Sequence, residues 1–129
     1  MRFAALLSVP LIVIGAQPAA SQTPTVIGVQ LANFSFTPES IILDHGHSYV
    51  LRLANVADGG HDFTAPEFFA ASVIAADDRR LIEDGEVEVP PGQVREIHLT
   101  APGATGKYHL KCSHSFHKMF GMSGSIIVR

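Results

Sequence analysis

The chain has 129 residues, of which 47% are hydrophobic, and this size suits one small domain with a single core. It carries 12 acidic and nine basic residues without a basic tract, which speaks against a nucleic-acid partner.

The first 21 residues have the layout of a secretory signal peptide. Arg2 precedes the apolar run of residues 3–16, and the small residues of "QPAAS" follow it. A membrane-anchoring helix is the alternative, but Pro10 interrupts the run, which is shorter than the roughly 20 apolar residues that a span requires. We expect cleavage near Ser21, which leaves residues 22–129 as one periplasmic or secreted domain without a membrane span.

The rest of the chain is predicted to form short strands separated by turns rich in Gly and Pro. The strand candidates are residues 25–36, 40–46, 47–55, 94–100, 107–112 and 124–129. In residues 47–55, Tyr49, Leu51 and Leu53 share one face and Arg52 lies on the other, as in a half-buried strand. Many short strands of this kind indicate an all-β sandwich or barrel.

One segment departs from this pattern. Residues 66–82 show weak strand alternation, and Pro66 stands at a plausible first position of a helix. We expect an excursion with a short helix here, with Phe68 and Phe69 in the core.

The phase of residues 107–112 places the only cysteine of the chain. Tyr108, Leu110 and Cys112 fall on one face, so the sulfur points in the same direction as the core residues. A lone cysteine in an exported domain cannot form an internal disulfide, which leaves a reactive thiol, an intermolecular bridge or a metal ligand. A role as a metal ligand would explain its presence. After Cys112 the alternation stops, and a loop leads to the apolar strand at the C-terminus.

This loop concentrates metal donors. Cys112, His117 and Met122 are separated by four residues each, and His61, which follows the turn "DGG", offers a second imidazole. A thiolate, two imidazoles and a distant thioether form the donor set of a blue-copper centre. Soft sulfur suits Cu(I) and nitrogen suits both oxidation states, so the set favours electron transfer. Taken singly, each of these residues is more often core filler or a surface side chain.

The pattern resembles the cupredoxins of the plastocyanin/azurin family, as a small secreted member of bacterial type. The matching features are Asn55 and His61 in "LANVADGGHDF", the strand "GKYHLKC", the Cys-x4-His-x4-Met loop and the C-terminal "GMSGSIIV". The resemblance implies a Greek-key β-sandwich of seven or eight strands that holds one copper ion. The ligands it implies are His61, Cys112 and His117 in one plane and Met122 in the axial position.

Several residues depart from or add to the family pattern. Asp62 stands where many family members have Asn. His114 and Met119 are further donors in the loop, but His114 is only two residues from Cys112 and Met119 lacks the family spacing, so we predict that neither binds. His45 and His47 could form a second site, for which a polar turn is the alternative explanation.

The function expected from these features is that of a monomeric, non-enzymatic electron carrier. By resemblance, a redox partner would dock over the loop around His117. The residues expected at this surface are Phe116, Lys118, Met119 and Phe120.

Two other functions remain open from the sequence. One is a periplasmic copper-handling protein that binds and delivers the ion without redox cycling, which the extra donors His114 and Met119 would support. The other is a hydrolase with Cys112 as nucleophile and His114 or His117 as base, although no orienting residue or oxyanion loop is evident.

Overall fold

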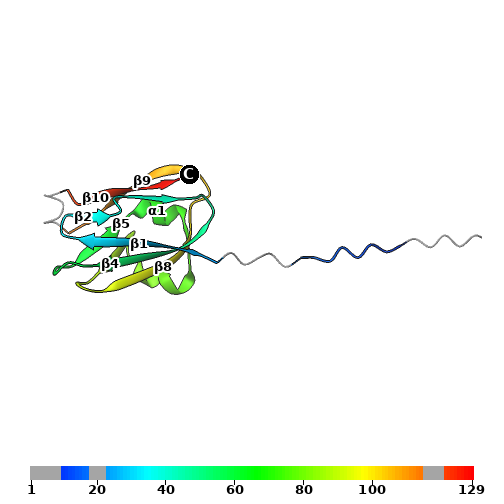
Figure 1. Cartoon of the computed structure of the whole chain (residues 1–129), viewed down its shortest axis with the longest axis horizontal. Coiled ribbons are helices and arrows are strands. Elements are labelled where there is room, and N and C mark those ends of the chain that lie inside the picture. The colour runs from blue at the N-terminus through cyan, green and yellow to red at the C-terminus, as the bar shows by residue number, and fades with distance from the viewer. Residues whose placement is uncertain (1–9, 18–22, 115–120) are drawn as a thin grey trace, which may run out of the picture.

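The computed structural model describes residues 10–17, 23–114 and 121–129. Within these residues, ten strands form two five-stranded sheets packed as a sandwich (Figure 1). The first sheet has the order β2-β1-β4-β8-β6 and contains β1 (Thr25–Ala32), β2 (Ser35–Thr37), β4 (Ser48–Asn55), β6 (Val73–Ile74) and β8 (Val94–Thr100). The second has the order β3-β10-β9-β5-β7 and contains β3 (Ser40–Leu43), β5 (His61–Thr64), β7 (Glu86–Val89), β9 (Gly106–Lys111) and β10 (Ser123–Val128).

The all-β sandwich predicted from the sequence is confirmed. The pairs β1·β4 and β3·β10 are parallel, and the other pairs are antiparallel. The structure has more strands than the seven or eight expected, because it also contains the three-residue β2 and the two-residue β6. These short strands extend the two edges of the first sheet.

The core lies between the sheets and follows the predicted alternation. In β4, Tyr49, Leu51 and Leu53 are buried and Arg52 is exposed. Aromatic rings extend the core, because Phe63 packs edge-on against Phe36 with ring centroids 6.0 Å apart.

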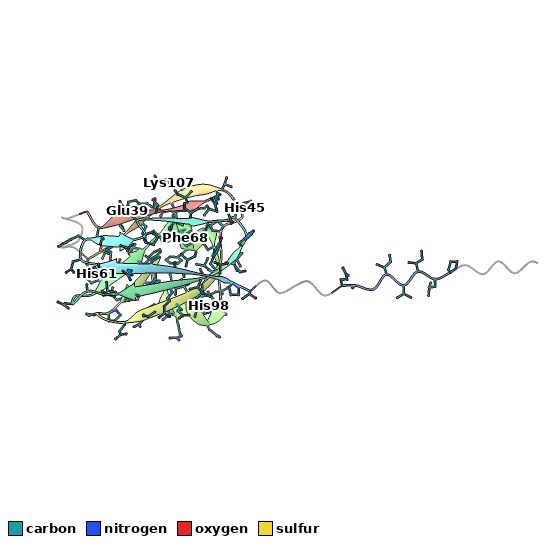
Figure 2. The ribbon with its side chains drawn as sticks, viewed as in Figure 1. Glu39, His45, His61, Phe68, His98 and Lys107 are labelled. Carbon is teal, nitrogen blue, oxygen red and sulfur yellow. The ribbon has the colours of Figure 1, made fainter. Side chains whose placement is uncertain are left out.

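The predicted excursion is also present. The helix α1 (Pro66–Ala71) starts at the expected proline, and the 3-10 helix η1 (Ala76–Leu81) follows. Phe68 and Phe69 of α1 are buried as expected, and Phe68 is labelled in Figure 2. The ring of Phe68 lies against that of Tyr108 of β9, with centroids 5.8 Å apart. Between the helices, β6 pairs with β8, so the excursion connects the two sheets.

Residues 10–17, within the predicted signal peptide, are exposed and have no regular secondary structure. None of the helices in the described parts of the chain is long and apolar enough to cross a membrane.

Candidate metal centre

His61 and Cys112 meet at one end of the sandwich. His61 is the first residue of β5, and Cys112 directly follows β9, which pairs with β5 through Thr64 and Lys111. His61 Nδ1 lies 3.9 Å from Cys112 Sγ, and the two residues are 0% and 1% exposed. Figure 2 shows His61 at this end of the molecule. Two strands of one sheet therefore direct a nitrogen and a sulfur toward the same buried point.

Met122, which directly precedes β10, reaches the same region. The Cys112 backbone N–H donates a hydrogen bond to the Met122 carbonyl at 3.1 Å, directly beyond the pair Ser123 and Lys111 of the β9–β10 ladder. Met122 is buried, with 2% exposure. The structure thus brings three of the four predicted donor residues together, and His117 lies outside the described residues.

Gly124 allows β10 to approach β3 at this end of the sandwich. A Cβ atom at Gly124 would lie 2.5 Å from the Glu39 carbonyl oxygen and 3.3 Å from Leu110 Cδ2. The Ser125 N–H donates to the same carbonyl at 2.9 Å, so the two backbones are held together there. The lack of a side chain at Gly124 therefore helps to set the position of Met122, two residues earlier.

The Cys112 thiol is buried and lies next to a backbone donor. The Asp62 N–H points to Cys112 Sγ at 3.5 Å. Burial raises the pKa of the Cys112 thiol, against the opposing effect of this hydrogen bond. A nucleophilic cysteine requires a lowered pKa and access to substrate, so this environment speaks against the hydrolase alternative.

The Asp62 side chain links the β5 segment to the segment that follows Cys112. Its Oδ1 accepts hydrogen bonds from the Ser113 N–H at 2.8 Å and the Thr64 hydroxyl at 2.7 Å, and its Oδ2 accepts from the Ser113 hydroxyl at 2.5 Å. Asp62, although it stands in place of Asn, therefore connects the segments that carry His61 and Cys112 directly.

Sequence analysis did not identify the acidic neighbours of this link. Glu88 of β7 contacts His114 Nε2 through both carboxylate oxygens, at 3.1 and 3.2 Å, and Asp62 Oδ2 lies 3.7 Å from the same nitrogen. Glu86 Oε2 lies 3.0 Å from Ser113 Oγ, and burial raises the pKa of the Glu86 carboxyl. The available signal was the alternation of acids and valines in "EVEV", which predicts a strand with both acids on one face.

Asp62, Glu88 and His114 also place one possible ligand atom each within 4.8 Å of one another. Hydrogen bonding between His114 and Glu88 accounts for this proximity without an ion. The described contacts of the His114 ring are therefore with the carboxylates of Glu88 and Asp62.

The histidines considered for a second site lie elsewhere. His45 Nδ1 is 3.0 Å from the carbonyl of Arg129, which directly follows β10. Met122 directly precedes β10, so His45 and Met122 lie at opposite ends of this strand. The six residues of β10 span roughly 20 Å at about 3.3 Å per residue. Figure 2 accordingly shows His45 near the opposite end of the sandwich from His61. His47 belongs to the same turn, where its N–H donates to the Asp44 carbonyl.

The donors present in the structure fit a copper ion. Metal–nitrogen and metal–sulfur bonds of about 2.0 and 2.3 Å, as in zinc sites, allow donor separations up to roughly 4.3 Å. The 3.9 Å between His61 Nδ1 and Cys112 Sγ falls within that limit, so one ion can contact both atoms. The buried Met122 adds the soft donor type that favours copper over zinc.

Solved structures share this two-sheet fold. Reduced auracyanin from the photosynthetic bacterium Roseiflexus castenholzii has a TM-score of 0.60 at 17% identity over 84% of this chain and 99% of that one. Auracyanin A from Chloroflexus aurantiacus, described as a "blue" copper protein, has 0.58 at 15% identity over 83% and 100%. The multicopper oxidase McoA from Aquifex aeolicus has 0.64 at 14% identity, over 88% of this chain but only 31% of the oxidase. These similarities establish the cupredoxin-like sandwich as the class of fold.

Sequence comparison gives the family. A search of the curated proteins finds no significant sequence match to the chain. Residues 24–129 match the copper binding proteins of the plastocyanin/azurin family. The chain belongs to this family of copper-binding proteins.

Proposed function

We propose that the protein is a mononuclear type 1 copper protein that carries single electrons between redox partners. The proposed ligands are His61, Cys112, His117 and Met122, with one ion in each chain. The observation that carries this proposal is the 3.9 Å approach of His61 Nδ1 to Cys112 Sγ in a buried setting. A copper ion bound there would supply the one-electron couple between Cu(II) and Cu(I).

The protein contributes rigidity and exclusion of water. His61 lies in β5 and Cys112 directly follows β9, and hydrogen bonds from Cys112 and Ser113 fix the start of the loop to Met122 and Asp62. Donors held in this way can change little when the oxidation state changes, which favours fast electron transfer. Their burial also keeps solvent from competing for the ion.

The test is the visible spectrum of the purified protein after addition of Cu(II). We expect an intense thiolate-to-copper charge-transfer band that saturates at one copper per chain, disappears with dithionite and returns on reoxidation. A protein that binds copper without this band would contradict the proposed centre.

A copper-handling protein remains the second candidate, and the same experiment separates the two. A carrier retains its ion through repeated reduction and oxidation, whereas a delivery protein would release Cu(I) to a competing chelator. The extra donors that favoured delivery are His114 and Met119. Their support is weakened because His114 contacts Glu88 at 3.1 Å, and Met119 lies outside the described residues.

Export, oligomeric state and partner docking follow from the same reading of the chain. We infer that residues 1–21 direct export to the periplasm or the outside of the cell, and that residues 22–129 act as a monomer without enzymatic turnover. We also infer that a redox partner docks over the loop. The proposed contacts Phe116, Lys118, Met119 and Phe120 lie outside the described residues.

Partner docking can be tested by electron-transfer kinetics at several ionic strengths. Lys118→Glu should slow transfer to an acidic partner at low salt, and Phe120→Ala should slow it at every salt concentration. Unchanged rates in both variants, with unaltered spectra, would place docking elsewhere.

A further inference from the structure

Asp62 is unusual because its charge is buried. The buried polar residues of the described chain are Asn55, His61, Asp62 and Thr64, and Asp62 is the only Asp, Glu, Lys or Arg among them. Burial of a carboxylate carries a large free-energy cost unless it is paired and hydrogen-bonded. An amide of the same shape would avoid this cost. The presence of an acid at position 62 therefore indicates that its charge has a use.

The hydrogen bonds of Asp62 identify it as an acceptor. Three donors reach its two oxygens, from the Ser113 N–H, the Ser113 hydroxyl and the Thr64 hydroxyl. The hydroxyl contacts of 2.5 and 2.7 Å fall in the range typical of hydroxyl groups that donate to a carboxylate anion. Each of these donors is neutral, so they stabilise the negative charge without cancelling it.

No lysine or arginine among the described residues forms an ion pair with Asp62. The arginine ion pairs in these parts of the chain join Arg52 to Glu96 and Arg129 to Asp44. The only ion pair of Asp62 there is with His114 at 3.7 Å, and His114 lies closer to Glu88, at 3.1 Å. The buried negative charge therefore remains available to a cationic centre nearby.

Asp62 lies next to the proposed copper site. It follows His61 in sequence, its own N–H points to Cys112 Sγ at 3.5 Å, and its carboxylate holds the residue after Cys112. Coulomb interactions between charges in a buried setting are strong, because little water screens them. Groups that surround metal ligands in this way tune the redox potential of the metal.

We propose that Asp62 is a positioning residue whose buried negative charge favours Cu(II) over Cu(I), and so lowers the reduction potential of the centre. This inference rests on the proposed copper function. One-electron reduction by an external donor lowers the positive charge of the centre by one unit. The Asp62 carboxylate therefore stabilises the oxidised centre more than the reduced one.

The test is the reduction potential of Asp62→Asn, which removes the charge and keeps the shape. Its amide oxygen can still accept from the Ser113 N–H, and its NH₂ group can donate to the Ser113 hydroxyl oxygen. We expect the charge-transfer band to persist and the redox equilibrium to shift toward Cu(I) by about tenfold or more, which is about 59 mV for one electron.

Glu88→Gln is the matched control, because it removes a carboxylate from the same cluster at a side chain that is 49% exposed. Solvent screens that charge, so the equilibrium should shift by less than about threefold. A shift in Asp62→Asn no larger than that in Glu88→Gln, or in the opposite direction, would overturn the proposal. An unfolding midpoint measured on each copper-free variant separates electrostatic from structural effects.

Asp62→Ser is the second variant, because it also removes the charge and leaves a smaller polar group. It should shift the potential in the same direction as Asp62→Asn. Failure of both variants to fold would also count against the proposal, since the carboxylate would then serve the fold itself. Absence of the charge-transfer band in the wild-type protein refutes the copper function instead, and it is seen before any potential is measured.

Discussion

The backbone N–H of Ser113 donates a hydrogen bond of 2.8 Å to the carboxylate of Asp62, across 51 positions of the chain. The contact extends the β5–β9 pairing, because the pair Thr64 and Lys111 continues two residues further to Asp62 and Ser113. It therefore joins the residue after one proposed ligand, His61, to the residue after another, Cys112. The geometry of the proposed centre depends on this junction.

Replacement of Cys112 by Ser should abolish the charge-transfer band, because the thiolate is the source of the transition. A hydroxyl at this buried position should lower the free energy of unfolding by no more than about 1–3 kcal/mol. Visible spectroscopy with Cu(II) and urea unfolding of the copper-free protein measure the two effects. A variant that stays intensely coloured would show that Cys112 is not the ligand.

Replacement of His61 by Ala should also remove the band, because this residue supplies an imidazole nitrogen 3.9 Å from the Cys112 sulfur. His114→Ala is the control, since the described contacts of that ring are with Glu88 and Asp62. It should retain the spectrum. Loss of colour in His114→Ala together with its retention in His61→Ala would reverse the ligand assignment.

Met122→Leu should keep copper and raise the reduction potential, because loss of a weak sulfur donor destabilises Cu(II) more than Cu(I). We expect a shift of about tenfold in the redox equilibrium, or about 59 mV. The swap conserves volume at a buried position and should cost less than about 1.5 kcal/mol of stability. Leu110→Met, a reverse swap at a fully buried neighbour of Cys112, should leave the potential unchanged.

Glu86 should make the copper-free protein less stable as pH rises. Burial raises the pKa of this carboxyl, whereas the unfolded chain titrates near the ordinary value of about 4.3. The folded state therefore binds more protons between those two pKa values, and stability falls as pH rises through that window. Glu86→Gln cannot ionise, so its free energy of unfolding relative to wild type should increase between pH 4 and pH 8.

Urea unfolding at the two pH values measures this change. Glu83→Gln, at an exposed position in the same hairpin, is the control for the removal of a carboxylate as such. A constant difference between Glu86→Gln and wild type at both pH values would contradict the prediction.

Gly124→Ala should destabilise the protein by about 1–3 kcal/mol, because the new Cβ would lie 2.5 Å from the Glu39 carbonyl oxygen and force β10 away from β3. The displacement should also disturb Met122 and shift the reduction potential. Gly28→Ala, in a strand with open space at its Cβ position, should be neutral or slightly stabilising. Equal stabilities of the two variants in urea unfolding would rule out the proposed close contact.

The sequence by itself predicted the elements whose signal is local. Strands β8 and β9 alternate more and less buried residues with a period of two, as does the second half of β4, and this pattern follows from burial of one face. The same phase correctly predicted a buried Cys112, and Pro66 marked the start of α1. The strand β5 gave no such signal, because all four of its residues are buried and no alternation exists.

Only the tertiary structure decided which distant residues surround Cys112. His61 was a candidate because of its residue type and the preceding turn, but its 3.9 Å separation from the Cys112 sulfur depends on how β5 pairs with β9. The same register buries the Asp62 carboxylate against Ser113, and β7 then brings Glu86 and Glu88 alongside. Pairing between segments about 50 residues apart is set by packing of the whole core, and local periodicity carries no information about it.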